Sequence, residues 1–532
     1  MNISTLLLQQ TLAQPKTAAI IERRWGRDLI TTYADLEFAA SRGVTLLLKQ
    51  GLKPGDGVLV FYPLSAALYI VLGALFRAEL TAMFLDPGVG RDHIERCCQI
   101  YPPKALIASP KAHLLRLTAP ALRQIPIKFV VGFPLPGAVS WNAIRRCRPT
   151  AEIASCSAET PALITFTSGS TGEPKTALRT HGFLIQQYQV IAQHLQLTTG
   201  AVDLVTLPIF VLANLAAGMT SVIPTGNLRR LGAIAPRPIL RQLQNNQPQR
   251  IVASPAFLQR LADYAISRNI TLPGVRRIFS GGAPIMPRLI EQLQSLAPQA
   301  DLHLVYGSTE AEPIATLNWT AQSRESRRQA VSAMLSGQGL LAGSPVPEIQ
   351  LRILRHQWGT PIKPYTQTDF TVDCLPPGEA GEIVVSGAHV LQGYLYGKGD
   401  AETKFWVEDN VWHRTGDSGY LGEQGRLWLL GRCQARIQDD RGLLYPFPVE
   451  CVAQHHPGIR RAALLPYQGK RILLVELRQS KGKSSLPELQ QSLHWAELDT
   501  IQVCRKIPMD RRHNAKVDYS AVFRQIRRIF TQ

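Results

Sequence analysis

The chain has 532 residues, of which 45% are hydrophobic and 18% charged. This length and composition exclude a single small domain and a largely disordered chain. The formal net charge of +19 suits nucleic acid, an anionic membrane surface or a polyanionic small molecule, and by itself does not choose among them.

The N-terminal segment has a short leucine run without a basic stretch before it, which is not the pattern of a secretory signal peptide. The 8 cysteines are scattered and form no CxxC pair of the kind that binds zinc. We therefore expect a cytoplasmic protein with reduced thiols.

Residues 58–76 carry no charge and approach the length of a membrane span. Pro63 divides them into a β-branched and aromatic run and an alanine- and leucine-rich run. This division predicts a strand, a turn and a buried helix in place of a transmembrane helix.

Short apolar runs that end at Gly, Pro or Ser alternate with helix-length segments over most of the chain. They occupy residues 55–62, 104–109, 127–133, 201–208, 250–254 and 275–282. This alternation predicts an α/β fold with parallel strands. After Pro376 the runs are joined by Gly-rich turns, at 378–387, 411–421 and 425–432, which indicates an antiparallel β subdomain. We expect a large domain over residues 1–430, made of layered α/β subdomains and this β subdomain, and a small α+β domain over residues 431–532.

Residues 164–181 read ITFTSGSTGEPKTALRTH, a Gly- and hydroxyl-rich loop with a lysine after an apolar run. Such loops make concave arrays of N–H groups that bind phosphate, although a Ser/Gly linker has a similar composition. Pro174 stands where a GxxxxGK[ST] loop needs glycine, so a P-loop is disfavoured. The GQGLLAG run at 337–343 is followed by Pro345 and Pro347, which disfavours a dinucleotide-binding helix.

Further motifs follow this loop in a fixed order: SGGAP (280–284), YGSTE (306–310), RTGD (414–417), GR (431–432) and NAK (514–516). Together with TSGSTGEPK (167–175), they closely resemble the adenylate-forming superfamily, which includes acyl-CoA synthetases, luciferases and peptide-synthetase adenylation domains. The resemblance spans nearly the whole chain. It implies that a carboxylic acid attacks the α-phosphorus of ATP, with Mg²⁺ present, and that pyrophosphate leaves.

The resemblance also implies a role for each matching residue. The β and γ phosphates would be wrapped by Thr167, Ser168, Gly169, Ser170, Thr171, Gly172 and Lys175, and the adenine would lie along Gly281, Gly282 and Ala283 and stack on Tyr306. Thr309 and Glu310 would lie near the α-phosphate and the metal, with Thr167 and Glu310 as metal ligands. Asp417 would bind the ribose, and Arg432 the ribose or phosphate. Lys516, on a mobile C-terminal domain, would bridge the substrate carboxylate and the α-phosphate.

This chain departs from its relatives at residues that serve the second step, in which the acyl group leaves the adenylate for an acceptor. Where relatives commonly have GRxDDxIKxxGxRIxPxEIE, this chain has Gln434 at the hinge, Gln438 for Lys, Arg441 for Gly and Leu443 for Arg. Beside Phe210, Val211 replaces a common histidine of the acyl pocket. These departures weigh against coenzyme A as acceptor. Segments such as FLDPGVGR and YGSTEAEPIA resemble the branch of fatty-acid ligases and olefin-biosynthesis β-lactone synthetases. We therefore expect a fatty acid or 3-hydroxy fatty acid substrate and lactone closure of its adenylate. The alternatives are a CoA thioester and transfer to a carrier protein or amine.

The C-terminal segment 517–530 is basic and amphipathic, with Arg524, Arg527 and Arg528 opposite apolar residues. Its ordinary interpretation is a helix packed on the small domain, and the alternative is a contact with an anionic membrane surface. No nucleic-acid-binding signature accompanies the charge, so we expect no nucleic-acid partner. Retention of Lys175, Glu310, Asp417 and Lys516 argues against a catalytically dead scaffold.

Overall fold

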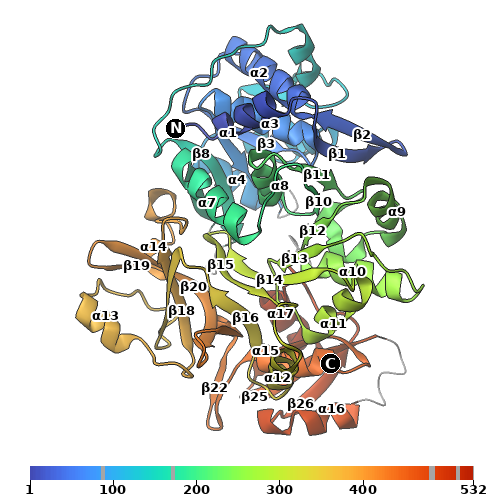
Figure 1. Cartoon of the computed structure of the whole chain (residues 1–532). Coiled ribbons are helices and arrows are strands. Elements are labelled where there is room, and N and C mark those ends of the chain that lie inside the picture. The colour runs from blue at the N-terminus through green and yellow to red at the C-terminus, as the bar shows by residue number, and fades with distance from the viewer. Residues whose placement is uncertain (86–89, 169–173, 479–485, 511–515, 531–532) are drawn as a thin grey trace. The chain divides into compact units, whose positions relative to one another are not determined.

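The computed structural model describes residues 1–85, 90–168, 174–478, 486–510 and 516–530 (Figure 1). The chain forms two compact units. The first comprises Met1–Leu228, Arg237–Val252 and Leu391–Asp400, and the second comprises Arg229–Pro236, Ala253–Val390 and Ala401–Gln532.

The first unit is built on two sheets with the strand orders β7-β6-β5-β3-β4-β8-β9 and β12-β10-β11-β1-β2. Its strands are β1 (Ala18–Arg24), β2 (Arg27–Thr32), β3 (Gly57–Phe61), β4 (Thr81–Phe84), β5 (Ala105–Ala108), β6 (Ile127–Val130), β7 (Val139–Ser140), β8 (Pro161–Ser168), β9 (Pro174–Thr180), β10 (Val202–Val205), β11 (Thr220–Ile223) and β12 (Arg250–Ala253). Its helices are α1 (Ser4–Ala13), α2 (Tyr33–Lys49), α3 (Ala66–Arg77), α4 (Arg91–Ile100), α5 (Pro110–His113), α6 (Pro120–Gln124), α7 (His181–His194), α8 (Pro208–Ala216) and α9 (Pro236–Asn246).

The short apolar runs form parallel strands, as the sequence predicts. Strand β3 pairs in parallel with β4 and β5, and β10 pairs in parallel with β11 and β12. The pairs β1–β2 and β8–β9 are antiparallel. Parallel strands are buried on both faces, which explains why β3 and β5 are apolar throughout. The buried Asp203 of β10 is instead paired with Arg250 of β12, at 2.8 Å.

The uncharged stretch at 58–76 divides as expected into β3 and α3. Ser65 caps α3, because its side chain accepts a hydrogen bond from the Leu68 backbone N–H at 3.4 Å. Over the described ranges, we find no helix with the length and apolar character needed to cross a bilayer.

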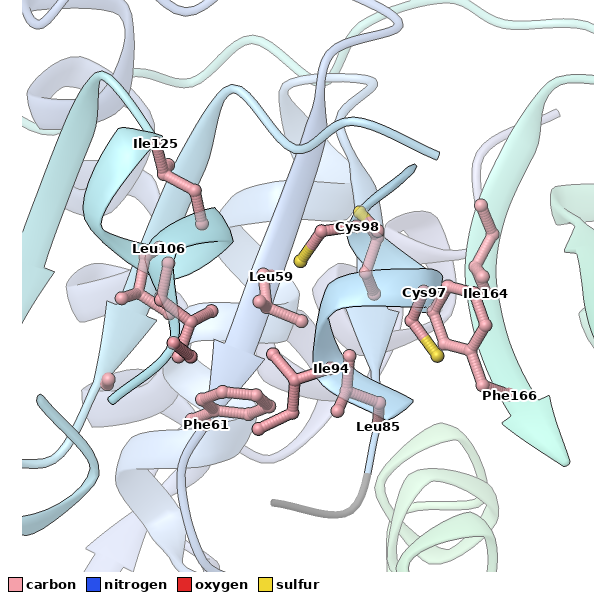
Figure 2. Packing of buried hydrophobic residues seen from close by; sticks show 14 residues of the cluster. Leu59, Phe61, Leu85, Ile94, Cys97, Cys98, Leu106, Ile125, Ile164 and Phe166 are labelled. Atoms are coloured by element: carbon pink, nitrogen blue, oxygen red, sulfur yellow. The ribbon is translucent and has the colours of Figure 1, made fainter. Parts of the chain in front are cut away.

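A buried apolar cluster fixes the strand that leads to the hydroxyl-rich loop. Figure 2 shows Ile164 and Phe166 of β8 packed with Leu59 of β3 and with Ile94 and Cys97 of α4. Their exposed fractions are at most 1%. Strand β8 is therefore anchored in the core up to the residues that precede the loop.

The second unit contains a sheet with the order β13-β14-β15-β16-β21-β20-β18-β17, with β19 on β20, and a separate sheet with the order β24-β25-β26. Its strands are β13 (Arg277–Gly281), β14 (Asp301–Ser308), β15 (Ala311–Asn318), β16 (Leu340–Pro345), β17 (Ile349–Leu354), β18 (Gly381–Gly387), β19 (Lys404–Val407), β20 (Asn410–Leu421), β21 (Leu427–Arg432), β22 (Ile437–Asp439), β23 (Gly442–Leu444), β24 (Ile459–Tyr467), β25 (Lys470–Leu477) and β26 (Thr500–Cys504). Its helices are α10 (Pro255–Ile266), α11 (Pro287–Leu296), α12 (Arg324–Leu335), α13 (Gln367–Asp373), α14 (Asp400–Thr403), α15 (Pro446–His455), α16 (Leu486–Ser492) and α17 (Tyr519–Phe530).

The predicted antiparallel subdomain is confirmed. Strands β17, β18, β20 and β21 pair antiparallel, and the pattern begins already at β14 and β15. The GQGLLAG run leads into strand β16 and not into a helix, which agrees with its rejection as a dinucleotide loop.

The C-terminal part of the chain has its own buried apolar clusters, because two of them contain only residues between 437 and 526. Val522 and Ile526 of α17 have 0% exposure and pack with Leu465 and Leu474, whereas Phe523 is 37% exposed. The described apolar face of α17 is thus largely used inside the protein, as in the ordinary interpretation. The boundary at residue 430 and the membrane contact stay predictions.

Glu450 is a buried carboxyl group that joins three elements of this segment. It lies on α15, and its Oε1 accepts hydrogen bonds from the Leu464 N–H of β24 at 3.1 Å and from the Tyr519 hydroxyl of α17 at 2.7 Å. Burial raises the pKa of Glu450 from 4.5 to about 8. The folded protein therefore holds this carboxyl group in its neutral form at neutral pH.

We predict that Glu450→Gln becomes more stable, relative to the natural protein, as pH rises from about 5 to about 8. The Glu450 carboxyl group loses its proton above about pH 4.5 in the unfolded chain and above about pH 8 in the folded protein. The stability that the natural protein gains from the neutral group is therefore complete below about pH 4.5 and is lost as the pH rises through about 8, whereas the variant has no such group to titrate. The difference in unfolding free energy should change by up to about 1.4 kcal/mol per pH unit. Urea unfolding at several pH values measures it, and a pH-independent difference would contradict the assignment.

Candidate active site

Three of the predicted nucleotide-binding residues meet at one place in the second unit. The Tyr306 hydroxyl, at the end of β14, donates to Asp417 Oδ2 at 2.8 Å, and Arg432 Nη1 lies 3.3 Å from Asp417 Oδ1. Asp417 and Arg432 are paired across β20 and β21. Burial and the Asp417 charge raise the pKa of Tyr306, so the phenol remains a hydrogen-bond donor.

A buried ion pair fixes the strand that carries Asp417. Arg414 and Glu382 are each 1% exposed, and the guanidinium donates two hydrogen bonds to Glu382 Oε2, at 2.7 and 3.0 Å. Arg414 also donates to the Thr360 carbonyl at 2.7 Å. The arginine of the RTGD motif therefore has a structural role, and it holds the strand three residues before Asp417.

Of the predicted adenine-binding residues, Gly281 ends β13, beside β14, and Gly282 and Ala283 follow it. Gly281 pairs with Val305, and a Cβ atom at Gly281 would approach the Val305 carbonyl oxygen to 2.6 Å. Gly282 has φ +80°, a conformation that favours glycine. The missing side chain at Gly281 therefore lets the backbones of β13 and β14 approach each other beside Val305, the residue that precedes Tyr306.

Thr309 and Glu310 form the turn between β14 and β15. The Glu310 N–H donates to Ser308 Oγ at 3.2 Å. The Glu310 carboxylate, Asp417 and Tyr306 all raise the pKa of Arg432, with Asp417 the largest cause. The turn therefore brings Glu310 into the same electrostatic cluster as the RTGD aspartate.

Lys516 completes this cluster. Its backbone N–H donates to Asp510 Oδ1 at 2.9 Å, and its carbonyl accepts from the Asp510 N–H at 2.8 Å. Burial, and then the neighbouring Arg432, lower the pKa of the Lys516 ammonium, while Asp417, Asp510 and Glu310 act in the opposite direction. A partly buried ammonium whose charge is supported by carboxylates is a suitable group to neutralise phosphate charge.

The predicted phosphate loop belongs to the first unit. The backbones of Thr167 and Ser168 end β8, and Thr167 pairs with Lys175 of β9. Gly169, Ser170, Thr171 and Gly172 lie outside the described residues. Lys175 Nζ lies 5.8 Å from the centre of the Tyr394 ring, and a Cβ atom at Gly399 would approach Lys175 Cδ to 2.9 Å. Neither of these two contacts of Lys175 follows from the sequence motif.

Sequence reasoning missed Glu312. It is the second residue of β15, two positions after Glu310, and it is partly exposed. Burial raises the pKa of its carboxyl group to about 7, and the Lys516 charge lowers it. The signal was present in the YGSTEAEP run as a second carboxylate beside the motif, but such a carboxylate is usually solvated.

Two places deserve comparison as metal sites. His356, Glu382 and Cys433 place potential ligand atoms within 4.8 Å of one another. Both Glu382 oxygens are already hydrogen-bonded, however, one of them to the Arg414 cation, which would repel a metal ion. Mg²⁺ prefers oxygen ligands, so the Glu310 carboxylate fits it better. The side chain of Thr167, the other predicted ligand, is outside the description.

Comparisons with known proteins identify the family of the chain. The model of the family described as AMP-binding enzyme matches residues 8–395. An olefin beta-lactone synthetase of Xanthomonas campestris pv. campestris is 30% identical over 522 residues, which cover 92% of this chain and 90% of that protein. One of Stenotrophomonas maltophilia is 31% identical over 513 residues, with coverages of 92% and 90%.

Solved structures show the same fold. The anthranilate CoA ligase AuaEII in complex with anthranoyl-AMP superimposes with a TM-score of 0.84 at 16% identity, covering 100% of this chain and 98% of that one. A benzoate CoA ligase from Burkholderia xenovorans LB400 gives a TM-score of 0.78 at 18% identity, with coverages of 98% and 99%. From the family match and the likeness to the two synthetases, we conclude that the chain belongs to the AMP-binding enzymes, the adenylate-forming superfamily, and is an AMP-forming ligase.

Proposed function

We propose that this enzyme uses ATP to activate a 3-hydroxy fatty acid to its acyl-adenylate and then closes the adenylate to a β-lactone with release of AMP. The observation that carries the proposal is the likeness to two olefin beta-lactone synthetases over 92% of the chain. The charge cluster around Lys516 supplies the chemistry of the first step.

In the first step, a carboxylate oxygen of the substrate bonds to the α-phosphorus, and the bond from that phosphorus to pyrophosphate breaks. Negative charge gathers on the phosphoryl oxygens in the transition state. In this proposal Lys516 holds the carboxylate against the α-phosphate, and Asp417 and Tyr306 hold the nucleoside. Mg²⁺, held by Glu310, would add positive charge at the phosphates.

In the second step, the 3-hydroxyl oxygen bonds to the acyl carbon while the bond from that carbon to the AMP oxygen breaks, and the hydroxyl proton is released. Nucleophile and electrophile belong to one molecule, so the reaction gains from proximity and needs no enzyme nucleophile. Neither coenzyme A nor a channel for it is required.

The hairpin β22–β23 supports closure over thiol transfer. Arg441, at the position where relatives commonly have glycine, pairs with Asp439 at 3.0 Å and with Asp499 at 2.8 Å. A large cation held by two carboxylates thus replaces the residue without a side chain. The alternatives, a CoA thioester and transfer to a carrier protein or amine, are distinguished by product analysis.

An apolar pocket in the first unit supports an alkyl-bearing substrate. It lies among α1, α3, α7 and α8, has a volume of about 40 Å³, and is lined by residues that include Leu7, Phe76, Leu184, Leu212 and Ala216. The lining residues recur every three or four positions along α3, α7 and α8, so each of these helices presents one face to it. Phe210 and Val211, the residues expected from sequence to border the acyl group, are buried and are not among its lining residues.

Lys516→Ala should lower the rate of adenylation by ~10²- to 10³-fold, because the transition state loses a positioned positive charge. The rate of ATP–pyrophosphate exchange with a 3-hydroxy fatty acid measures this step. Lys506→Ala is the matched control, since Lys506 is an exposed lysine of the same unit. If Lys516→Ala exchanges pyrophosphate at the natural rate, the assignment is wrong.

Product analysis tests the fate of the adenylate. With ATP, Mg²⁺ and a 3-hydroxy fatty acid, we expect AMP and a β-lactone to accumulate in equal amounts without coenzyme A. A plain fatty acid should support pyrophosphate exchange without a lactone. Turnover that requires coenzyme A, with either acid, would replace the proposal by a CoA ligase.

Ala216→Leu should shift the preference of the enzyme toward shorter acids, because the larger side chain fills the pocket. We expect kcat/KM for the longest accepted acid to fall by about tenfold or more, and for a short acid to change little. Ala217→Leu, one residue further on and outside the lining, is the matched control. An equal fall in kcat/KM for acids of all chain lengths would show that this pocket does not bind the acyl chain.

A further inference from the structure

The hairpin β1–β2 ends in a turn whose residues do not suit its backbone. Arg24 pairs with Arg27, so Trp25 and Gly26 form a two-residue turn, with φ angles of +47° and +79°. Turns of this kind favour Asn-Gly, because these residues adopt positive φ at little cost. A bulky tryptophan at positive φ is unfavourable, and two arginines directly opposite each other repel. Residues that oppose their own local structure in this way are expected where they have another role.

The turn is nevertheless held in place by hydrogen bonds. Arg23 Nη2 donates to the Gly26 carbonyl at 2.7 Å, and Arg23 Nη1 pairs with Asp28 Oδ1 at 3.2 Å. The second oxygen of Asp28 accepts a hydrogen bond from Asn246 Nδ2 of α9 at 3.1 Å. The hairpin is therefore tied to α9, and its tip is presented in a defined position on the first unit.

Large apolar side chains are exposed along this hairpin. Trp25 is 94% exposed, and Ile30 and Leu29 of β2 are 57% and 47% exposed. Strand β2 is the last in the order of its sheet, and Figure 1 shows the hairpin extending from that sheet with its tip away from α2 and α3. Edge strands of soluble proteins are usually protected by charged residues or proline. Exposed apolar side chains on an edge hairpin therefore indicate a surface that contacts another molecule.

Positive charge accompanies these apolar side chains. The Arg24 side chain is 40% exposed, although its Nε pairs with Glu22 Oε1 at 2.9 Å, and Arg27 is exposed. The two arginines flank the Trp25–Gly26 turn. An anionic partner would relieve their mutual repulsion, whereas the net charge of +19 opposes association with a second copy of the chain.

We propose that the tip of β1–β2 docks the enzyme on an anionic lipid bilayer, with Trp25 among the headgroups and Arg24 and Arg27 against their phosphates. The tryptophan ring suits this boundary, because it is apolar and keeps one N–H donor, and arginine binds phosphate oxygens through paired donors. A nucleic acid would satisfy the arginines but would offer no apolar phase to Leu29 and Ile30. This surface goes beyond the proposed function, and it would bring the enzyme to the phase into which long-chain acids partition.

The test is co-sedimentation of the full chain with vesicles of mixed anionic and zwitterionic phospholipids, and with purely zwitterionic vesicles. We expect binding to the anionic vesicles that weakens as the salt concentration rises, and much weaker binding to the zwitterionic ones. Arg27→Gln should lower the partition coefficient by about fivefold, because one cation near the surface is lost.

Trp25→Asn separates a docking role from a structural one. Asparagine suits the turn better than tryptophan does, so the free energy of unfolding should stay the same or rise. The partition coefficient on anionic vesicles should nevertheless fall by about tenfold. Urea unfolding measures the first quantity and co-sedimentation the second. A fall in both would assign Trp25 to the fold and overturn its docking role.

Phe133→Ala and Arg123→Gln are the matched controls, since Phe133 is 83% exposed and Arg123 is an exposed arginine of the same unit. Both should keep the natural partition coefficient. Absence of vesicle binding, equal losses in the controls, or unchanged binding in Trp25→Asn and Arg27→Gln would each overturn the inference. A loss confined to Arg528→Gln would overturn it in favour of α17.

Two other partners are outcomes of the same set of variants. A dimer that Trp25→Asn dissociates, measured by light scattering without lipid, would overturn the inference and assign the surface to a second copy of the chain. Nucleic-acid binding that Arg27→Gln weakens, without vesicle binding, would overturn it as well. Vesicle binding is measured without ATP or acid, so a failure of the proposed function would leave this result unaffected.

Discussion

The charge balance around Lys516 is the constraint on which the site of the second unit depends. Burial and Arg432 oppose the ammonium form of Lys516, while Asp417, Asp510 and Glu310 support it. Asp417 is at the centre of this balance, because it also binds Arg432 and the Tyr306 hydroxyl. Each buried charge is stabilised by the others, so β20 and β21, which carry Asp417 and Arg432, must be held in fixed positions.

The fold meets this requirement through antiparallel pairing and one fully buried ion pair. Register places Asp417 opposite Arg432 on adjacent strands. The bonds from Arg414 to Glu382 join β20 to β18, so the strand that presents Asp417 is held by a pair that cannot exchange with solvent. An uncompensated partner of such a pair would cost about 3–5 kcal/mol, so the scaffold and the site are linked energetically.

Sequence reasoning reached the alternation of strands and helices and the antiparallel subdomain, and its ordered motifs named Lys516, Arg432, Asp417 and Glu310 of the charge cluster, but not Asp510. Sequence reasoning did not predict contacts that depend on the register between strands far apart in the chain. Arg414 belonged to a recognised motif, yet its partner Glu382 is 32 residues away in the chain and no local pattern joins them. Glu312 could not be placed either, because its packing against Gly307 depends on the irregular pairing between β14 and β15.

The residues that replace the common hinge motif are compatible with intramolecular closure of the adenylate to a lactone. A thiol acceptor must approach the adenylate from outside, which requires a passage and a backbone free of bulky groups. Around β22–β23 the chain instead has Asp439, whose pKa is lowered to about 2 by hydrogen bonds from Arg471 and Arg441. Arg471 also donates to the Gly442 carbonyl at 3.1 Å, which ties the hairpin to β25. A hairpin fixed in this way is compatible with a nucleophile that arrives already attached to the substrate, because closure then needs only correct orientation of the hydroxyl group and no entry path.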